Sequence, residues 1–128
     1  MKLKIKDIEW EFKVLSKRTY EKENGKTSYA LTVMEDRSVE FHEEYVSMPI
    51  VLHELAHVYF TSCCTISSSE YTKAEIVEEI FAEIWQYHFT QVMENATLIH
   101  EALINQKNLL RLRRENARKS ARRITKRK

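Results

Sequence analysis

The chain is poor in turn-forming residues: its 128 residues include one glycine and one proline. So few breakers favour helices and argue against a turn-rich β-sandwich. The only two cysteines, Cys63 and Cys64, are adjacent, which excludes a secreted disulfide framework and does not resemble a zinc knuckle. No apolar run approaches the length of a membrane span, and the start, MKLKIKDIEWEF, lacks the apolar region of a signal peptide. We therefore expect a cytoplasmic protein without a membrane span.

Charge, by contrast, is abundant and unevenly distributed. Residues 1–110 hold eleven Lys and Arg against eighteen Asp and Glu, a net charge of −7. Residues 111–128 hold ten Lys and Arg against one acid, a net charge of +9. We interpret residues 1–110 as one folded domain and residues 111–128 as a basic C-terminal tail.

The tail allows several interpretations. A run of like charges is commonly a solvated, partly disordered terminus. Clustered Lys and Arg also bind nucleic acid by releasing counterions from phosphates. An acidic partner, a membrane surface and the chain's own acidic body are further candidates for the tail's contact. The tail has no aromatic residue to stack on bases, so sequence-specific reading of single strands is not expected.

Hydropathy patterning in the first third predicts a small antiparallel sheet. Apolar and charged residues alternate over 8–14, the period of a half-buried strand. Asn24-Gly25 predicts a hairpin turn. A second strand is expected over 28–34, with Tyr29, Leu31 and Val33 in register, and a third, short strand over 39–42. Such a sheet needs a cover to bury its apolar face.

Helices are expected to supply that cover, which makes the fold class α+β. The first helix is predicted over about 48–61, with Ser47 as its N-cap. A second begins around Tyr71 and runs past Met93. Its apolar positions keep helical spacing: Ile76, Val77, Ile80, Phe81, Ile84, Trp85 and Val92. A third helix-forming block starts near residue 96 and becomes steadily more basic.

The first predicted helix contains VLHELAHVYF (51–60), in which two histidines stand four residues apart. His53 and His57 then lie one above the other on one helix face, where both imidazoles can bind one Zn2+ ion. Glu54 points about 100° away, beside a zinc-bound water that it can activate as a general base. This is the zinc-peptidase H-E-x-x-H pattern. The surrounding residues are apolar, so these three polar side chains would be costly to bury without a partner such as a metal.

A zinc-peptidase site needs a third protein ligand and an open fourth position. The downstream candidates are Glu75, Glu78, Glu79, Glu83, His88 and His100. On a helical wheel Glu78 falls within the apolar arc of the second helix, whereas the other three glutamates fall on its polar side. An acid on a buried stripe makes Glu78 the first choice, with Glu79 in reserve. His88 is expected to be a core histidine with a hydrogen-bond partner, and an all-histidine site is the remaining alternative.

The H-E-x-x-H stretch, followed by EIVEEIFAEIWQYH (75–88), resembles small zinc metallopeptidases of the gluzincin type. The resemblance is to ImmA/IrrE-like and phage-encoded metallopeptidase-like proteins, and it covers roughly residues 39–88. It implies a sheet before the H-E-x-x-H helix and a glutamate on the next helix that completes the site. Two details depart from the family pattern: Ala56 stands in place of the usual glycine, and EEIFA only echoes E-A-N-x-F-A.

By this resemblance His53 and His57 are zinc ligands, Glu54 is the general base and the Glu78–Glu79 pair contains the third ligand. The expected activity is hydrolysis of peptide bonds in a specific protein substrate. The strand at 39–42 is a candidate edge that pairs with extended substrate. Candidate donors to the developing oxyanion are Tyr59, Tyr71, Tyr87 and His88.

Two other function classes remain open. One is a non-catalytic zinc-containing module that binds nucleic acid or an acidic partner through the basic tail. The other is a metal-free helical interaction protein. A general base beside two ligands has no purpose in a closed structural site, which favours the enzyme.

Overall fold

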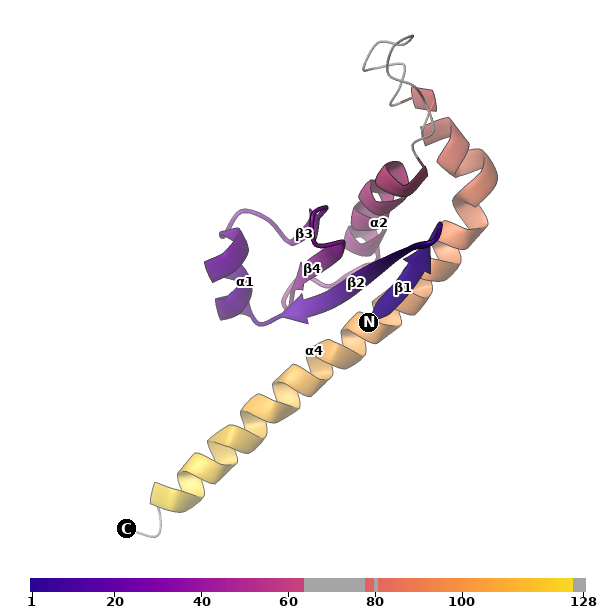
Figure 1. The fold of residues 1–128 in the computed structure, drawn as a ribbon. Helices are drawn as coiled ribbons and strands as arrows, with labels where there is room; N and C mark the ends of the chain where they lie inside the picture. The colour runs from indigo at the N-terminus through magenta and orange to yellow at the C-terminus, as the bar shows by residue number, and fades with distance from the viewer. Residues whose placement is uncertain (64–77, 80, 126–128) are drawn as a thin grey trace.

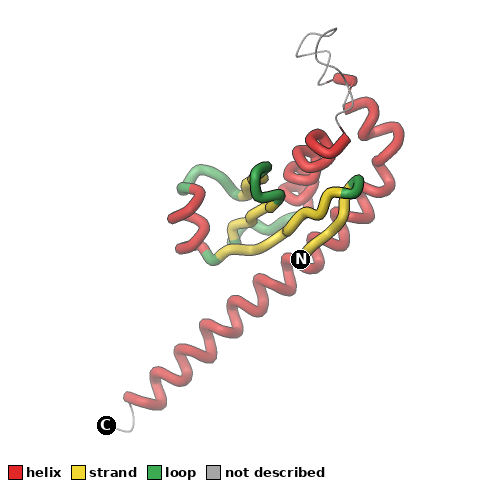
Figure 2. Tube along the Cα trace, viewed as in Figure 1, coloured by secondary structure: helices red, strands yellow, loops and turns green. Residues whose placement is uncertain are grey.

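A computed structural model of the protein describes residues 1–63, 78–79 and 81–125. The described part combines one sheet with helices, so the predicted α+β class is confirmed (Figures 1 and 2). The strands are β1 (Lys2–Ile5), β2 (Ile8–Leu15), β3 (Ala30–Val33) and β4 (Ser38–His42). The helices are α1 (Lys17–Asn24), α2 (Met48–Cys63), the π-helix η1 (Ile84–His88) and α4 (Phe89–Thr125).

The sheet is mixed, with strand order β1-β2-β4-β3. β1 pairs antiparallel with β2, and β3 pairs antiparallel with β4, but β2 and β4 are parallel neighbours. The prediction of an antiparallel three-stranded sheet is therefore wrong in two respects: β1 was missed, and the central pair runs parallel. Parallel neighbours require a crossover connection rather than a tight turn.

α1 lies within that crossover, where a hairpin turn was predicted at Asn24-Gly25. Ser16 caps its first turn, because its hydroxyl accepts a hydrogen bond of 3.3 Å from the Thr19 N–H. Gly25 follows its last residue with φ of +80°, and its N–H donates to the Glu21 carbonyl at 3.2 Å. The glycine thus ends a helix, a role for which its tolerance of positive φ suits it equally well.

The two faces of the sheet are covered by different helices. On one face, Phe12 and Val39 pair in register, and α2 and α4 bury this face. On the other face, Tyr20 of α1 is fully buried and packs edge-on against His42, with ring centroids 5.3 Å apart. β4 lies between both layers and is buried along its whole length.

The face assignment of β3 differs from the sequence pattern. Ala30 and Thr32 pair with Phe41 and Val39 and share the face covered by α2, whereas Tyr29 is 56% exposed. The expected in-register set of Tyr29, Leu31 and Val33 therefore does not form the core face. A shift of one residue moves every side chain of a strand to the opposite face, and β3 is too short for its own pattern to decide.

Helix α4 is longer than the sequence pattern indicated. The predicted second helix and the basic third block are continuous from Phe89 to Thr125, and the predicted start near Tyr71 lies outside the described residues. Ala96, Ile99 and Leu103 are buried against the sheet. Beyond Leu110 the helix projects from the body, and residues 111–122 are all exposed (Figure 1).

Candidate functional site

Helix α2 presents the two histidines of the H-E-x-x-H motif on a face away from its core contacts. Val51, Leu55 and Val58 are fully buried at helical spacing, which fixes the rotation of the helix. His53 and His57 consequently point to solvent and are exposed. The premise that both histidines would be buried among apolar residues is therefore wrong, and only the glutamate of the motif is buried.

The two imidazoles converge on one point. The Nε2 atoms of His53 and His57 lie 3.3 Å apart, and the ring planes are inclined at 77°. Two nitrogens bound to one tetrahedral zinc at about 2.0–2.1 Å each lie about 3.3–3.4 Å apart. The pair therefore has the separation that a single zinc ion requires, and its exposure leaves room for further ligands.

Glu54 lies on the inner side of the same helix. Its side chain is 6% exposed, and its Oε2 accepts a hydrogen bond of 2.6 Å from the Thr32 hydroxyl of β3. A hollow of about 420 Å³ opens between the β3 segment and α2, with Tyr29, His53 and Glu54 among its lining residues. Glu54 and His53 thus line the same hollow.

Thr32 and Tyr29 were not recognised from the sequence. Thr32 reaches Glu54 because the β3–β4 register places it opposite Val39, on the face that α2 covers. Tyr29 packs against Tyr45 with ring centroids 4.6 Å apart and planes inclined at 45°, and it also lines the hollow. Their only sequence signal is membership of a strand preceding the motif, and it identifies neither residue.

The predicted third ligand is not brought to the histidines in the described residues. Glu78 and Glu79 are both exposed, and no group of three metal-binding side chains occurs within residues 1–63, 78–79 and 81–125. Glu78 borders a hollow with Phe81 and Trp85, and the latter two also border a separate hollow of about 330 Å³ beside His53. Glu75 lies outside the described residues.

The wheel argument for Glu78 assumed a buried apolar stripe. Phe81 and Trp85 are 64% and 62% exposed, whereas Ile84 and Val92 are partly buried, so the part of the stripe next to Glu78 is not buried. The argument loses its premise, and Glu78 and Glu79 stand as predictions on the resemblance alone.

The other predicted site residues occupy varied positions. Tyr59 is buried, and its hydroxyl accepts a hydrogen bond of 2.8 Å from Asn95, which directs it into the core. Tyr87 is 69% exposed, whereas Tyr71 lies outside the described residues. His88 is only partly buried, with its ring 6.0 Å from that of Tyr59, so it is not the core histidine expected.

The predicted substrate edge is also displaced. The strand at 39–42 corresponds to β4, which pairs on both sides and offers no free edge. β3 is the outer strand at this end of the sheet, and it adjoins the hollow beside Glu54.

Among the described helices, none combines the length and apolar character needed to span a bilayer.

No family model, curated protein or solved structure matches this chain.

Proposed function

We propose that the protein is a zinc-dependent metallopeptidase that hydrolyses peptide bonds of a specific protein substrate. One observation carries the proposal: the Nε2 atoms of His53 and His57 lie 3.3 Å apart, while Glu54 adjoins the same hollow as His53. A separation matching a tetrahedral zinc supports the two histidines as ligands. The Glu78–Glu79 pair is proposed to contain the third ligand.

The chemistry follows from the residue types. When bound, zinc would supply a Lewis acid that polarises a water molecule and the peptide carbonyl. Glu54 would accept a proton from the attacking water and return it to the leaving amine. Thr32 holds one carboxylate oxygen, which leaves the other free for that exchange. An extended substrate is proposed to pair with the outer edge of β3, which adjoins the hollow.

The test combines metal content with hydrolysis. The purified wild type should contain about one zinc per chain by mass spectrometry, and His53→Ala or His57→Ala should remove it. Of Glu78→Ala and Glu79→Ala, the variant that also loses zinc identifies the third ligand. The wild type should cleave members of a fluorogenic peptide library. Glu54→Gln should keep zinc and lose this cleavage, since the base is lost and the ligands remain.

Three outcomes would contradict the proposal. A wild type without stoichiometric zinc would favour the hypothesis of a metal-free interaction protein. Stoichiometric zinc without cleavage of any library peptide would favour the non-catalytic zinc module. Cleavage that persists in Glu54→Gln would exclude Glu54 as the base.

A further inference from the structure

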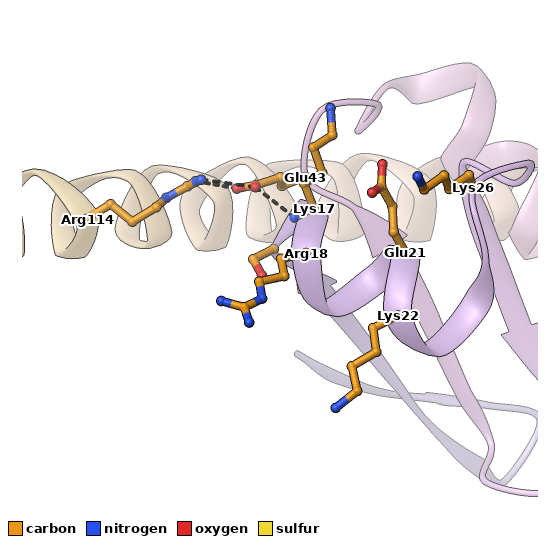
Figure 3. A pocket seen from close by; sticks show the side chains of 8 residues that line it. Lys17, Arg18, Glu21, Lys22, Lys26, Glu43 and Arg114 are labelled. Atoms are coloured by element: carbon orange, nitrogen blue, oxygen red, sulfur yellow. Dashed lines mark hydrogen bonds and ion pairs between the residues drawn. The ribbon is translucent and has the colours of Figure 1, made fainter.

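Two hollows that share no residue with the hollow beside Glu54 are lined largely by cations. The larger, of about 680 Å³, lies between α1 and α4, and Figure 3 shows Lys17, Arg18, Lys22, Lys26 and Arg114 around it. The second, of about 340 Å³, is lined by Lys107, Arg111 and Arg114 of α4 together with acidic residues. Arg114 and Glu43 belong to both, so the hollows adjoin.

The pair of Glu43 and Arg114 fixes α4 beside α1. The Glu43 side chain is 7% exposed, and both of its oxygens accept hydrogen bonds from the Arg114 guanidinium, one of them at 3.0 Å. The Lys17 backbone N–H also donates to Glu43 at 2.8 Å (Figure 3). A bidentate pair of this kind restrains both position and orientation. The long helix therefore has a defined place relative to α1.

Acids neutralise only some of the cations around the two hollows. Lys17 forms an ion pair of 3.3 Å with Glu44, and Arg111 lies 3.9 Å from Glu115. Arg114 is paired with Glu43, and Glu21 also lines the larger hollow (Figure 3). Within the described residues, Arg18, Lys22 and Lys26 form no ion pair, and we call these three the α1 cations. All three are exposed to solvent and line this hollow.

Helix α4 extends the charged surface in one direction. Five cations recur along it at helical spacing, and we call them the α4 stripe: Lys107, Arg111, Arg114, Arg118 and Arg122. At 100° per residue they fall within an arc of about 80°, and they span about 22 Å along the axis. Arg114 of the stripe contacts Glu43, which also accepts from the Lys17 N–H at the start of α1. The stripe therefore lies next to the α1 cations.

We propose that the α1 cations and the α4 stripe form one basic surface that binds the phosphate backbone of double-stranded nucleic acid. A duplex carries one negative charge per roughly 1.7 Å of axis, so an evenly spaced row of cations complements it along its length. No aromatic side chain lines either hollow or occurs in the described part of α4 beyond residue 105, so stacking on unpaired bases is not provided.

The apolar residues of this segment argue against a membrane surface. Leu109 and Leu112 are exposed and lie on the side of the helix opposite the stripe. Arg113 and Lys119 fall on that same side. A membrane-surface helix needs a continuous apolar face opposite its basic residues, and here charged residues interrupt it. The inference is independent of the proposed peptidase activity, because it uses none of the H-E-x-x-H residues.

The experiment measures binding of the full chain to a fluorescein-labelled DNA duplex by anisotropy over a range of salt concentrations. For the wild type, the logarithm of the binding constant should fall linearly with the logarithm of the salt concentration. Arg18→Gln/Lys22→Gln and Arg118→Gln/Arg122→Gln should each weaken binding about tenfold and lower the salt slope by about two. Circular dichroism verifies that each variant is folded.

A control pair separates position from net charge. Lys4→Gln/Lys6→Gln also removes two positive charges, but from β1 and the turn that follows it. It should change the affinity for the duplex less than about twofold. Equal weakening by this pair, or an unchanged affinity in the α1 variant, would overturn the composite surface. Absent binding of wild type at low salt, tighter binding to a single strand, or equal binding to anionic vesicles would overturn the proposed partner.

Discussion

At the scale of single residues, the buried carboxylate of Glu54 depends on one neighbour from another element. The Thr32 hydroxyl donates to it at 2.6 Å, and Glu54 is only 6% exposed. A buried carboxylate that loses a donor retains the cost of its desolvation. The short bond therefore serves both stability and the orientation of the proposed base.

Replacing Thr32 by valine keeps the shape of the side chain and removes the hydroxyl. We expect Thr32→Val to lower the free energy of unfolding by about 1–3 kcal/mol, measured by urea denaturation. Thr32→Ser, which keeps the donor, is the matched control and should retain more of the stability. A serine variant as unstable as the valine variant would show that packing, not the hydrogen bond, is what Thr32 contributes.

At the scale of elements, a side chain of α4 completes the edge of the sheet. β1 pairs with β2 as far as Glu11, and Met1 continues the pairing by exchanging two hydrogen bonds with Phe12. The next edge group, the Val14 N–H, needs another partner. Gln106 supplies it: its Oε1 accepts from the Val14 N–H at 3.0 Å, and its Nε2 adds a second donor to the Phe12 carbonyl at 3.3 Å. An unpaired strand edge is a liability, and the helix covers it here.

Gln106→Leu should free this edge. We expect the free energy of unfolding to fall by about 1–2 kcal/mol, because the Val14 N–H loses a partner that water replaces only in part, whereas the Phe12 carbonyl keeps Met1. The amide hydrogen of Val14 should exchange faster with solvent, as measured by NMR. Asn105→Leu, at an exposed neighbouring position, is the control and should leave Val14 protected. Unchanged exchange at Val14 in Gln106→Leu would contradict this role.

At the scale of the whole molecule, two buried carboxylates, those of Glu40 and Glu43, form ion pairs with Lys13 and Arg114 from other elements. Burial alone would raise the pKa of Glu40 and of Glu43. The hydrogen bonds from Asn24 and Lys13 to Glu40 outweigh burial and leave its pKa below the ordinary value. The Lys17 N–H and Arg114 do the same for the pKa of Glu43. Both groups bind protons more weakly in the folded chain than in the unfolded one.

Stability should therefore fall in acid. Because the folded pKa of Glu43 is lowered, its contribution is complete above the ordinary pKa of 4.5 and is lost as pH falls through the folded value. Glu43→Gln should reduce the free energy of unfolding at pH 7 by about 1–3 kcal/mol and flatten its acid dependence, measured by urea denaturation across pH. Glu44→Gln removes a half-exposed partner of Lys17 and is the control, with a change of under about 1 kcal/mol. Identical acid dependence in wild type and Glu43→Gln would refute the assignment.

The sequence by itself determined the features that depend on neighbouring residues along the chain. A helix places residues four apart on one face, so the convergence of His53 and His57 follows from local geometry. The alternation over β2 likewise identified its buried side chains, Trp10, Phe12 and Val14. The α+β class follows from the same local periodicities.

Tertiary structure decided what depends on contacts between distant segments. The parallel pairing of β2 with β4 and the register of β3 determine that Thr32 reaches Glu54, and no local pattern encodes either. Packing likewise decides that Phe81 is exposed. It also decides that the basic helix lies beside α1, where Arg114 contacts Glu43. The physical reason is that local periodicity specifies which residues share a face, whereas packing selects what that face meets.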